Sequence, residues 1–235
     1  MALALVSLLP AQAAESGWCL VQKSTSIGDQ KIWISPSYLR IESKNSRTVT
    51  FAAAPEWKVI TYSKVRKIYY ITTPANFTAR FAFVSGTFNR TNLGALQYIK
   101  GEIIHDKGNT SRSYRPAATR ENTYRQNDER VWNPKIEELE DSNLSKQSMI
   151  ILAHLYNLPV LDGVPLSVNV TVESNSVGRK LRAILETTAI SKCKVETGKD
   201  PSLKDFKLCQ DEQAFSNANN DSIDLKDFTD YIGPK

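Results

Sequence analysis

The sequence predicts an α+β fold built on a curved, mostly antiparallel sheet with covering helices. Three observations lead to this expectation. Residues 30–71 contain five short segments rich in β-branched and aromatic residues, which favour strands. The breaks between them are too short for crossover helices, so neighbouring strands must pair as antiparallel hairpins. Apolar residues occupy both alternating sets of positions, which indicates that both faces of the sheet are covered.

Length and composition are those of an ordinary globular chain. The protein has 235 residues, of which 41% are hydrophobic and 23% charged. No run of about 20 apolar residues is present, so no membrane-spanning helix is expected. The net charge of +5 favours transient contact with anionic membrane surfaces. We expect a single domain over residues 15–235 and a monomer.

The first 14 residues resemble a signal peptide. An apolar run over residues 3–9 precedes Ala11-Gln12-Ala13, a small-x-small pattern typical of signal peptidase sites. No Lys or Arg precedes the run, and the alternative is a buried first helix. The signal-peptide interpretation predicts cleavage near residue 14 and a periplasmic or otherwise exported protein.

Three cysteines remain after this cleavage. Cys193 and Cys209 are close enough in sequence to close a small loop, and we expect them to form a disulfide with Cys19 free and packed. The alternative is three reduced, buried thiols.

Two helices are expected to cover the sheet. Thr73 and Pro74 suit a helix start, and Phe77, Phe81 and Val84 recur at helical spacing until Gly86. The second helix starts after Ser142 or Ser145 and ends near residue 157. Its apolar side contains Met149, Leu152, Leu155 and Tyr156.

Further strands flank the second helix. Residues 96–106 have strand character, and residues 164–173 alternate strictly between apolar and polar side chains. Residues 180–195 return as a partner strand or strands. The segment from residue 196 onward retains apolar residues and is expected to wrap the sheet edge.

Residues 109–133 are rich in arginine and interleaved with aromatic residues. Arg112 and Arg130 lie near its two ends. A phosphate- or nucleic-acid-binding loop is one interpretation, because arginine binds phosphate and aromatic rings stack on bases. Interspersed acids and the lack of a nucleic-acid motif favour a solvated loop with strand fragments, so no nucleic-acid partner is expected.

A search for catalytic chemistry finds no supporting pattern. His105 and His154 have no second ligand at metal-binding spacing, and no nucleophile, phosphate-loop or dinucleotide motif is present. Acidic residues from Glu137 to Asp141 precede a helix, where they interact well with its N-terminus. A row of aspartates from Asp221 to Asp230 has a spacing of three, typical of a wet helical face. The alternative is weak Ca²⁺ binding, which no loop glycine or EF-hand pattern supports. We therefore expect no enzyme activity, cofactor or metal.

Several short motifs, in order along the chain, resemble the periplasmic lipoprotein carriers (Lol-type) and their uncharacterised relatives. They are IWISPSYLRI at 32–41, WKVI at 57–60, KIYY at 67–70, KGEI at 100–103, LPVLDGVPL at 158–166, LET at 185–187 and DFT at 227–229. The resemblance implies an incomplete β-barrel with helices forming a lid over an apolar cavity. Ser35 stands where the lipoprotein carriers have a lid-latching arginine, so the chain is closer to the uncharacterised branch.

These expectations lead to a non-enzymatic protein that binds a lipid or acylated ligand in the cavity. The predicted cavity-facing residues are Trp33, Leu39, Ile41, Phe51, Trp57, Ile60, Tyr62 and Tyr70, and the predicted lid residues are Phe77, Phe81, Leu152 and Leu155. The alternative is an envelope protein-interaction module with a filled core. Its contact surface would be the 112–130 segment and the basic hairpin with Lys64, Arg66 and Lys67.

Overall fold

The computed structural model describes residues 14–82, 93–106, 109–117, 124–126, 129–141, 143–174, 178–197 and 202–220. The expected signal peptide over residues 1–14 lies outside this part, except for Ala14, the first residue of β1. The strands are β1 (Ala14–Ser24), β2 (Gly28–Ser35), β3 (Tyr38–Ser43), β4 (Thr48–Ala53), β5 (Val59–Ser63), β6 (Ile68–Thr72), β7 (Tyr98–Asp106), β8 (Asn109–Pro116), β9 (Tyr124–Gln126), β10 (Glu129–Leu139), β11 (Val164–Ser174), β12 (Gly178–Glu196) and β13 (Lys207–Leu208). The helices are α1 (Lys146–Tyr156) and α2 (Glu212–Asn220).

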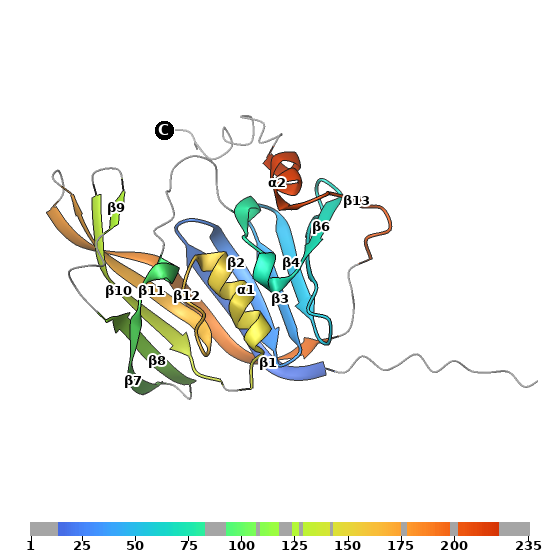
Figure 1. Cartoon of the computed structure of the whole chain (residues 1–235). Coiled ribbons are helices and arrows are strands. Elements are labelled where there is room, and N and C mark those ends of the chain that lie inside the picture. Colours follow the sequence, from blue (N-terminus) through green and yellow to red (C-terminus); the bar gives the residue numbers. More distant parts are fainter. Residues whose placement is uncertain are drawn as a thin grey trace, which may run out of the picture.

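These strands form one curved, unclosed sheet in the order β13-β6-β5-β4-β3-β2-β1-β12-β11-β10-β8-β7, with β9 paired to β10 (Figure 1). Strands β1 to β6 are sequential neighbours joined by short turns, as the hairpin pattern predicts. The pairs along the sheet are antiparallel, except that β13 runs parallel to β6. The expected α+β fold with a curved, mostly antiparallel sheet is therefore confirmed.

Helix α1 lies against one face of the sheet, here called the inner face (Figure 1). The Ser145 hydroxyl accepts a hydrogen bond from the Gln147 N–H at 3.1 Å and caps the helix start. Asn157, with φ 55°, ends the helix in the left-handed conformation. The apolar residues Met149, Leu152 and Leu155 are buried, so the predicted helix and its inward face are confirmed.

The helix expected over residues 74–86 is wrong in its described part. Two short 3-10 turns, η1 (Pro74–Asn76) and η2 (Arg80–Ala82), occupy it, and residues 83–86 lie outside the described residues. Phe77 is extended and Ala79 has φ 55°, and both conformations interrupt an α-helix. Phe77, directly after η1, and Phe81, within η2, nevertheless both reach the inner core.

The opposite, outer face of the β1–β6 meander carries a second apolar cluster. Tyr38, Phe51, Ile60 and Tyr62 are buried there, and Leu203 and Phe206 from the chain after β12 pack against them. The rings of Tyr62 and Phe206 meet edge to face at 5.9 Å. Both faces of this sheet region are therefore covered, as predicted. The segment after residue 196 also reaches the sheet edge, where β13 pairs with β6.

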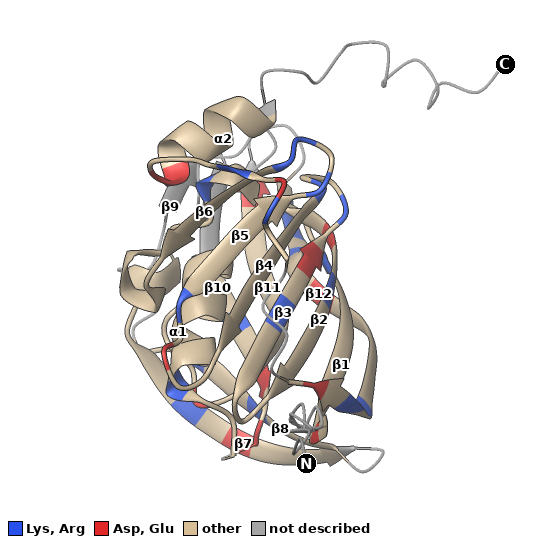
Figure 2. Ribbon diagram, turned by 90° about the vertical axis from the view of Figure 1, so that its right-hand side faces the viewer, with Lys and Arg blue, Asp and Glu red and all other residues tan. Residues whose placement is uncertain are grey.

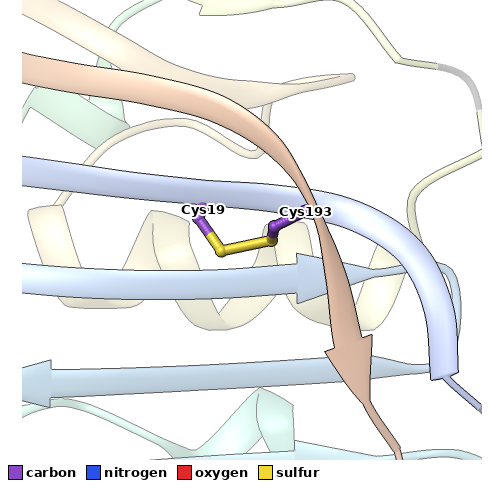
Figure 3. Close-up of a disulfide and its surroundings, with 2 residues drawn as sticks. All are labelled: Cys19 and Cys193. Atoms are coloured by element: carbon purple, nitrogen blue, oxygen red, sulfur yellow. A yellow bond between two sulfur atoms is a disulfide. The ribbon is translucent and has the colours of Figure 1, made fainter.

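The structure links Cys19 to Cys193 and leaves Cys209 free among the described cysteines, so the predicted pairing of Cys193 with Cys209 is wrong. Strands β1 and β12 are neighbours, and the two Cα atoms are 5.9 Å apart (Figure 3). Cys209 follows β13, whereas six strands separate β13 from β12 in the sheet. That separation is on the order of 30 Å along the sheet, so nearness in sequence does not bring these thiols together.

Candidate ligand-binding site

Three rows of side chains cross the inner face of the meander, because directly paired residues on neighbouring strands point to the same side. The first row contains Trp18, Ile34, Leu39 and Ala52; the second contains Leu20, Ile32, Ile41, Thr50, Thr61 and Tyr70; the third contains Gln22, Gln30, Ser43, Thr48, Ser63 and Ile68. Every one of these side chains is buried. The inner face thus changes from apolar to polar along the strands, toward the end that bears the 44–47 and 64–67 turns.

The polar row meets helix α1 at Tyr156. The Tyr156 hydroxyl donates to Gln22 Oε1 at 2.6 Å and also contacts Gln30 Oε1. Gln22 is held in its orientation, because its Nε2 donates to the Pro165 carbonyl at 2.7 Å and to Thr187 Oγ1 at 2.9 Å. Burial raises the pKa of Tyr156, so the hydroxyl is a neutral donor.

Gln30 is the incompletely satisfied member of this row. Its side chain is 2% exposed, and its Nε2 has no partner among the described residues. Rotating the amide by about 180° would let Nε2 donate to the Tyr156 hydroxyl. Oε1 would then occupy the former position of Nε2 and would itself lack a partner. A buried polar atom left unpaired costs about 1–3 kcal/mol. This amide is therefore a candidate contact for a polar group of a ligand.

Helix α2 covers the polar end of the inner face together with the 74–82 segment. The Phe215 ring lies 5.1 Å from Tyr70 and 5.5 Å from Phe81, which forms a buried aromatic cluster. The Glu212 carboxylate accepts hydrogen bonds from Thr78 N–H at 3.0 Å, Thr78 Oγ1 at 2.8 Å and Arg80 N–H at 2.5 Å. We call this set of contacts the α2 latch.

The predicted cavity residues divide between the two faces of the sheet. Leu39, Ile41 and Tyr70 lie in the inner cluster, and Trp57 packs partly buried against it. The inward prediction is wrong for the other four, which belong to the outer cluster: Trp33, Phe51, Ile60 and Tyr62. Ile32 and Ile34 point inward, so strand alternation sends Trp33 outward, and hairpin register carries that parity to the next strands. The alternation around Trp33, combined with the hairpin register, could have predicted the correct face for these four residues.

The four predicted lid residues lie together in the inner cluster. Phe77, Phe81, Leu152 and Leu155 are each 0–2% exposed. Two of them come from α1 and two from the 74–82 segment, so both elements share one apolar interior with the sheet. In this structure the cover is packed directly against the inner face.

A buried acidic residue, Glu138, has a different role from the one predicted. It was expected among the acids before a helix, but it lies on β10 and is fully buried. Its carboxylate accepts hydrogen bonds from the Tyr114 hydroxyl at 2.5 Å and the Gly163 N–H at 2.8 Å. Desolvation by burial raises the pKa of Glu138. The carboxylate ties β8, β10 and the loop before β11 together.

The described parts of the arginine-rich segment lie in β8, β9 and the first half of β10. Arg112, on β8, makes an ion pair with Glu140, which follows β10. The side chain of Arg130 lies outside the described part of the structure. Arg112 therefore has a structural partner.

Within the described residues, no three His, Cys, Asp or Glu side chains gather as metal ligands. None of the helices in that part of the chain is long and apolar enough to cross a membrane.

The chain matches no family model and no curated protein. Among solved structures, it is similar to an uncharacterized conserved protein from Thermus thermophilus. The TM-score is 0.32 and the identity 8%, over 83% of this chain and 90% of that chain.

Proposed function

We propose that this protein is an exported, non-enzymatic, carrier-like protein that binds an acyl-chain ligand between the inner face of the half-barrel and its helical cover. The observation that carries the proposal is the buried inner face, where apolar rows lead to a polar row in which Gln30 Nε2 has no partner among the described residues. The acyl chain would lie along residues such as Leu20, Ile32 and Leu39. The polar end of the ligand would reach Gln30 and Tyr156.

The polar row favours a ligand with an uncharged head. Apart from Ile68 at one end, its members are glutamine, serine and threonine, and the neutral Tyr156 hydroxyl lies beside them. Burying a carboxylate or phosphate without a cation nearby costs several kcal/mol. The oxygen of an ester, amide or hydroxyl can instead accept a hydrogen bond from Gln30 Nε2 at no such cost. A monoacylglycerol is therefore a better probe than a fatty acid.

Ligand entry requires the cover to move, because its side chains fill the space next to the sheet. Hydrogen bonds of Glu212 and the contacts of Phe215 hold α2 in place. We place the opening step at the α2 latch, which lies beside the polar row. The resemblance of the sequence motifs to the periplasmic lipoprotein carriers supports this arrangement of half-barrel and lid.

Export is supported by the disulfide between Cys19 and Cys193, because such bonds persist in oxidising compartments. The apolar leader-like run at the N-terminus points the same way.

Native mass spectrometry of protein purified from the exported fraction tests this function, followed by titration with a fluorescent monoacylglycerol. We expect a stoichiometric lipid or uptake of the probe, and Gln30→Leu should weaken uptake by roughly tenfold through loss of one hydrogen bond. Lys31→Leu, on the opposite face of the same strand, is the matched control and should bind normally. If the purified protein contains no lipid and also does not bind the fluorescent monoacylglycerol, the proposal is overturned.

A second candidate function, the envelope interaction module, is favoured by one observation at the β7 edge. Strand β7 ends the sheet order, and Ile99, Ile103 and Ile104 are 44–47% exposed along it. An edge strand with exposed apolar side chains can pair with an extended segment of another protein. Two results together would favour this function. The parent protein would capture a stoichiometric envelope partner but take up no lipid, and the Ile103→Lys variant would fail to capture that partner.

A further inference from the structure

Two neighbouring turns of the meander concentrate positive charge. Residues 44–47 (KNSR) and 64–67 (KVRK) contain five basic residues and no acidic residue. Lys44, Arg47 and all of 64–67 are exposed. We call these two turns the basic end.

The two turns lie at the same end of the sheet, because alternate turns of an antiparallel meander return to the same side. The polar row, with Ser43, Thr48 and Ser63, is the row of inner side chains nearest to them. Asn219 of α2 donates to the Ser46 carbonyl at 3.2 Å, which brings α2 to this end as well. Figure 2 shows the blue turns near α2.

Within the described part of the chain, Glu42 and Asp29 lie next to the first turn, and Asp205 lies two residues before Lys207. Glu42, on the strand before the first turn, is paired with Arg40 at 2.6 Å. The backbone of Asp29 accepts from Lys44 N–H, which places one aspartate beside the first turn. On the other side, the Lys207 N–H donates to the Lys67 carbonyl and adds a further cation next to the second turn.

We propose that the basic end docks on an anionic lipid surface. Clustered lysine and arginine side chains near a surface of anionic lipids each strengthen binding roughly fivefold. The turns carry no aromatic residue on which bases could stack, so a single-stranded nucleic acid is a poorer fit. Docking in this orientation brings α2 and the polar row toward the bilayer, and it does not depend on which ligand the interior holds.

Vesicle co-sedimentation of the full mature chain tests the docking. Phosphatidylcholine vesicles with phosphatidylglycerol are compared with pure phosphatidylcholine vesicles. The test variant is Lys44→Glu, Lys64→Glu and Lys67→Glu together. The control variant is Lys58→Glu, Lys146→Glu and Lys194→Glu, which has the same net charge but changes exposed lysines toward the opposite end.

We expect the parent protein to bind the anionic vesicles and to lose binding at high salt. The basic-end variant should lose at least about a hundredfold in affinity, and the control variant less than about tenfold. Equal losses in the two variants would overturn the proposal, as would equal binding of the parent protein to both vesicle types. Binding to oligonucleotides in place of vesicles would overturn it in favour of a nucleic-acid partner.

The same two variants separate docking from ligand uptake. Both should take up the fluorescent monoacylglycerol like the parent protein, because none of the changed lysines lies on the inner face. Failure of uptake in the parent protein would count against the proposed function and leave the vesicle result unaffected.

Discussion

The hydroxyl of Tyr114 donates a 2.5 Å hydrogen bond to the carboxylate of Glu138, deep between β8 and β10. The second carboxylate oxygen accepts from the Gly163 N–H, so both oxygens have partners. Burial nevertheless outweighs these hydrogen bonds and raises the pKa of Glu138 above the ordinary 4.5. The protonated form is therefore favoured by folding, relative to the unfolded chain.

Glu138 should make the stability of the protein depend on pH. A raised folded-state pKa contributes stability that is fully present below 4.5 and is lost as the pH rises through the folded value. The Glu138→Gln variant can keep both contacts with the Tyr114 hydrogen bond reversed, and it does not titrate. Urea unfolding from acidic to neutral pH should show parent stability falling relative to this variant. A parallel pH dependence in the two proteins would contradict the assignment, and Glu140→Gln serves as the control.

Gly163 should tolerate no larger residue. A Cβ at this position would lie 1.8 Å from the Leu139 carbonyl oxygen, so the loop before β11 would have to move away from β10. The movement would also break the hydrogen bond to Glu138. We expect Gly163→Ala to lower the free energy of unfolding by about 3 kcal/mol. Gly178→Ala has open space around its Cβ and is strained only by its φ of 71°, so it should cost less.

Substitution of a disulfide-bonded cysteine should cost more stability than substitution of the free cysteine. Cys19 and Cys193 close a loop with a sequence separation of 174, and removing such a link costs about 2–5 kcal/mol. Cys193→Ser should therefore lower the unfolding free energy strongly, while Cys209→Ser should change it by less than about 1 kcal/mol. Peptide mapping without reduction should recover the 19–193 pair. Recovery of a 193–209 pair would contradict the structure.

Glu212 should control the opening of the cover. Glu212→Ala removes three hydrogen bonds to Thr78 and Arg80, each of which contributes about 1 kcal/mol or more. Hydrogen exchange should rise in residues 74–82 and 212–220, with little change in β1 to β5. Gln210→Ala, an exposed change just before α2, is the control. Exchange that rises equally across the whole sheet would mean global destabilisation instead of local opening.

Local patterns in the chain were sufficient for much of the fold. Hairpin turns between β-branched segments predicted the meander, and the Ser145 and Asn157 ends with their apolar stripe predicted α1. The mixed apolar character of both strand faces predicted that both would be covered. These features depend on contacts between residues close in sequence, where strand alternation and helix capping act directly.

Other features were decided only when distant segments met. Cys19 pairs with Cys193 because β1 and β12 are neighbours in the sheet, and Glu138 is buried because Tyr114 and Gly163 approach it from two other elements. The inner row from Gln22 to Ser63 depends on the register of five successive strands, and parity errors on β2, β4 and β5 placed half of the predicted cavity residues on the wrong face. Long-range pairing is set by the packing of the whole chain, and no local pattern encodes which strands pair when they are far apart in sequence, as β1 and β12 are.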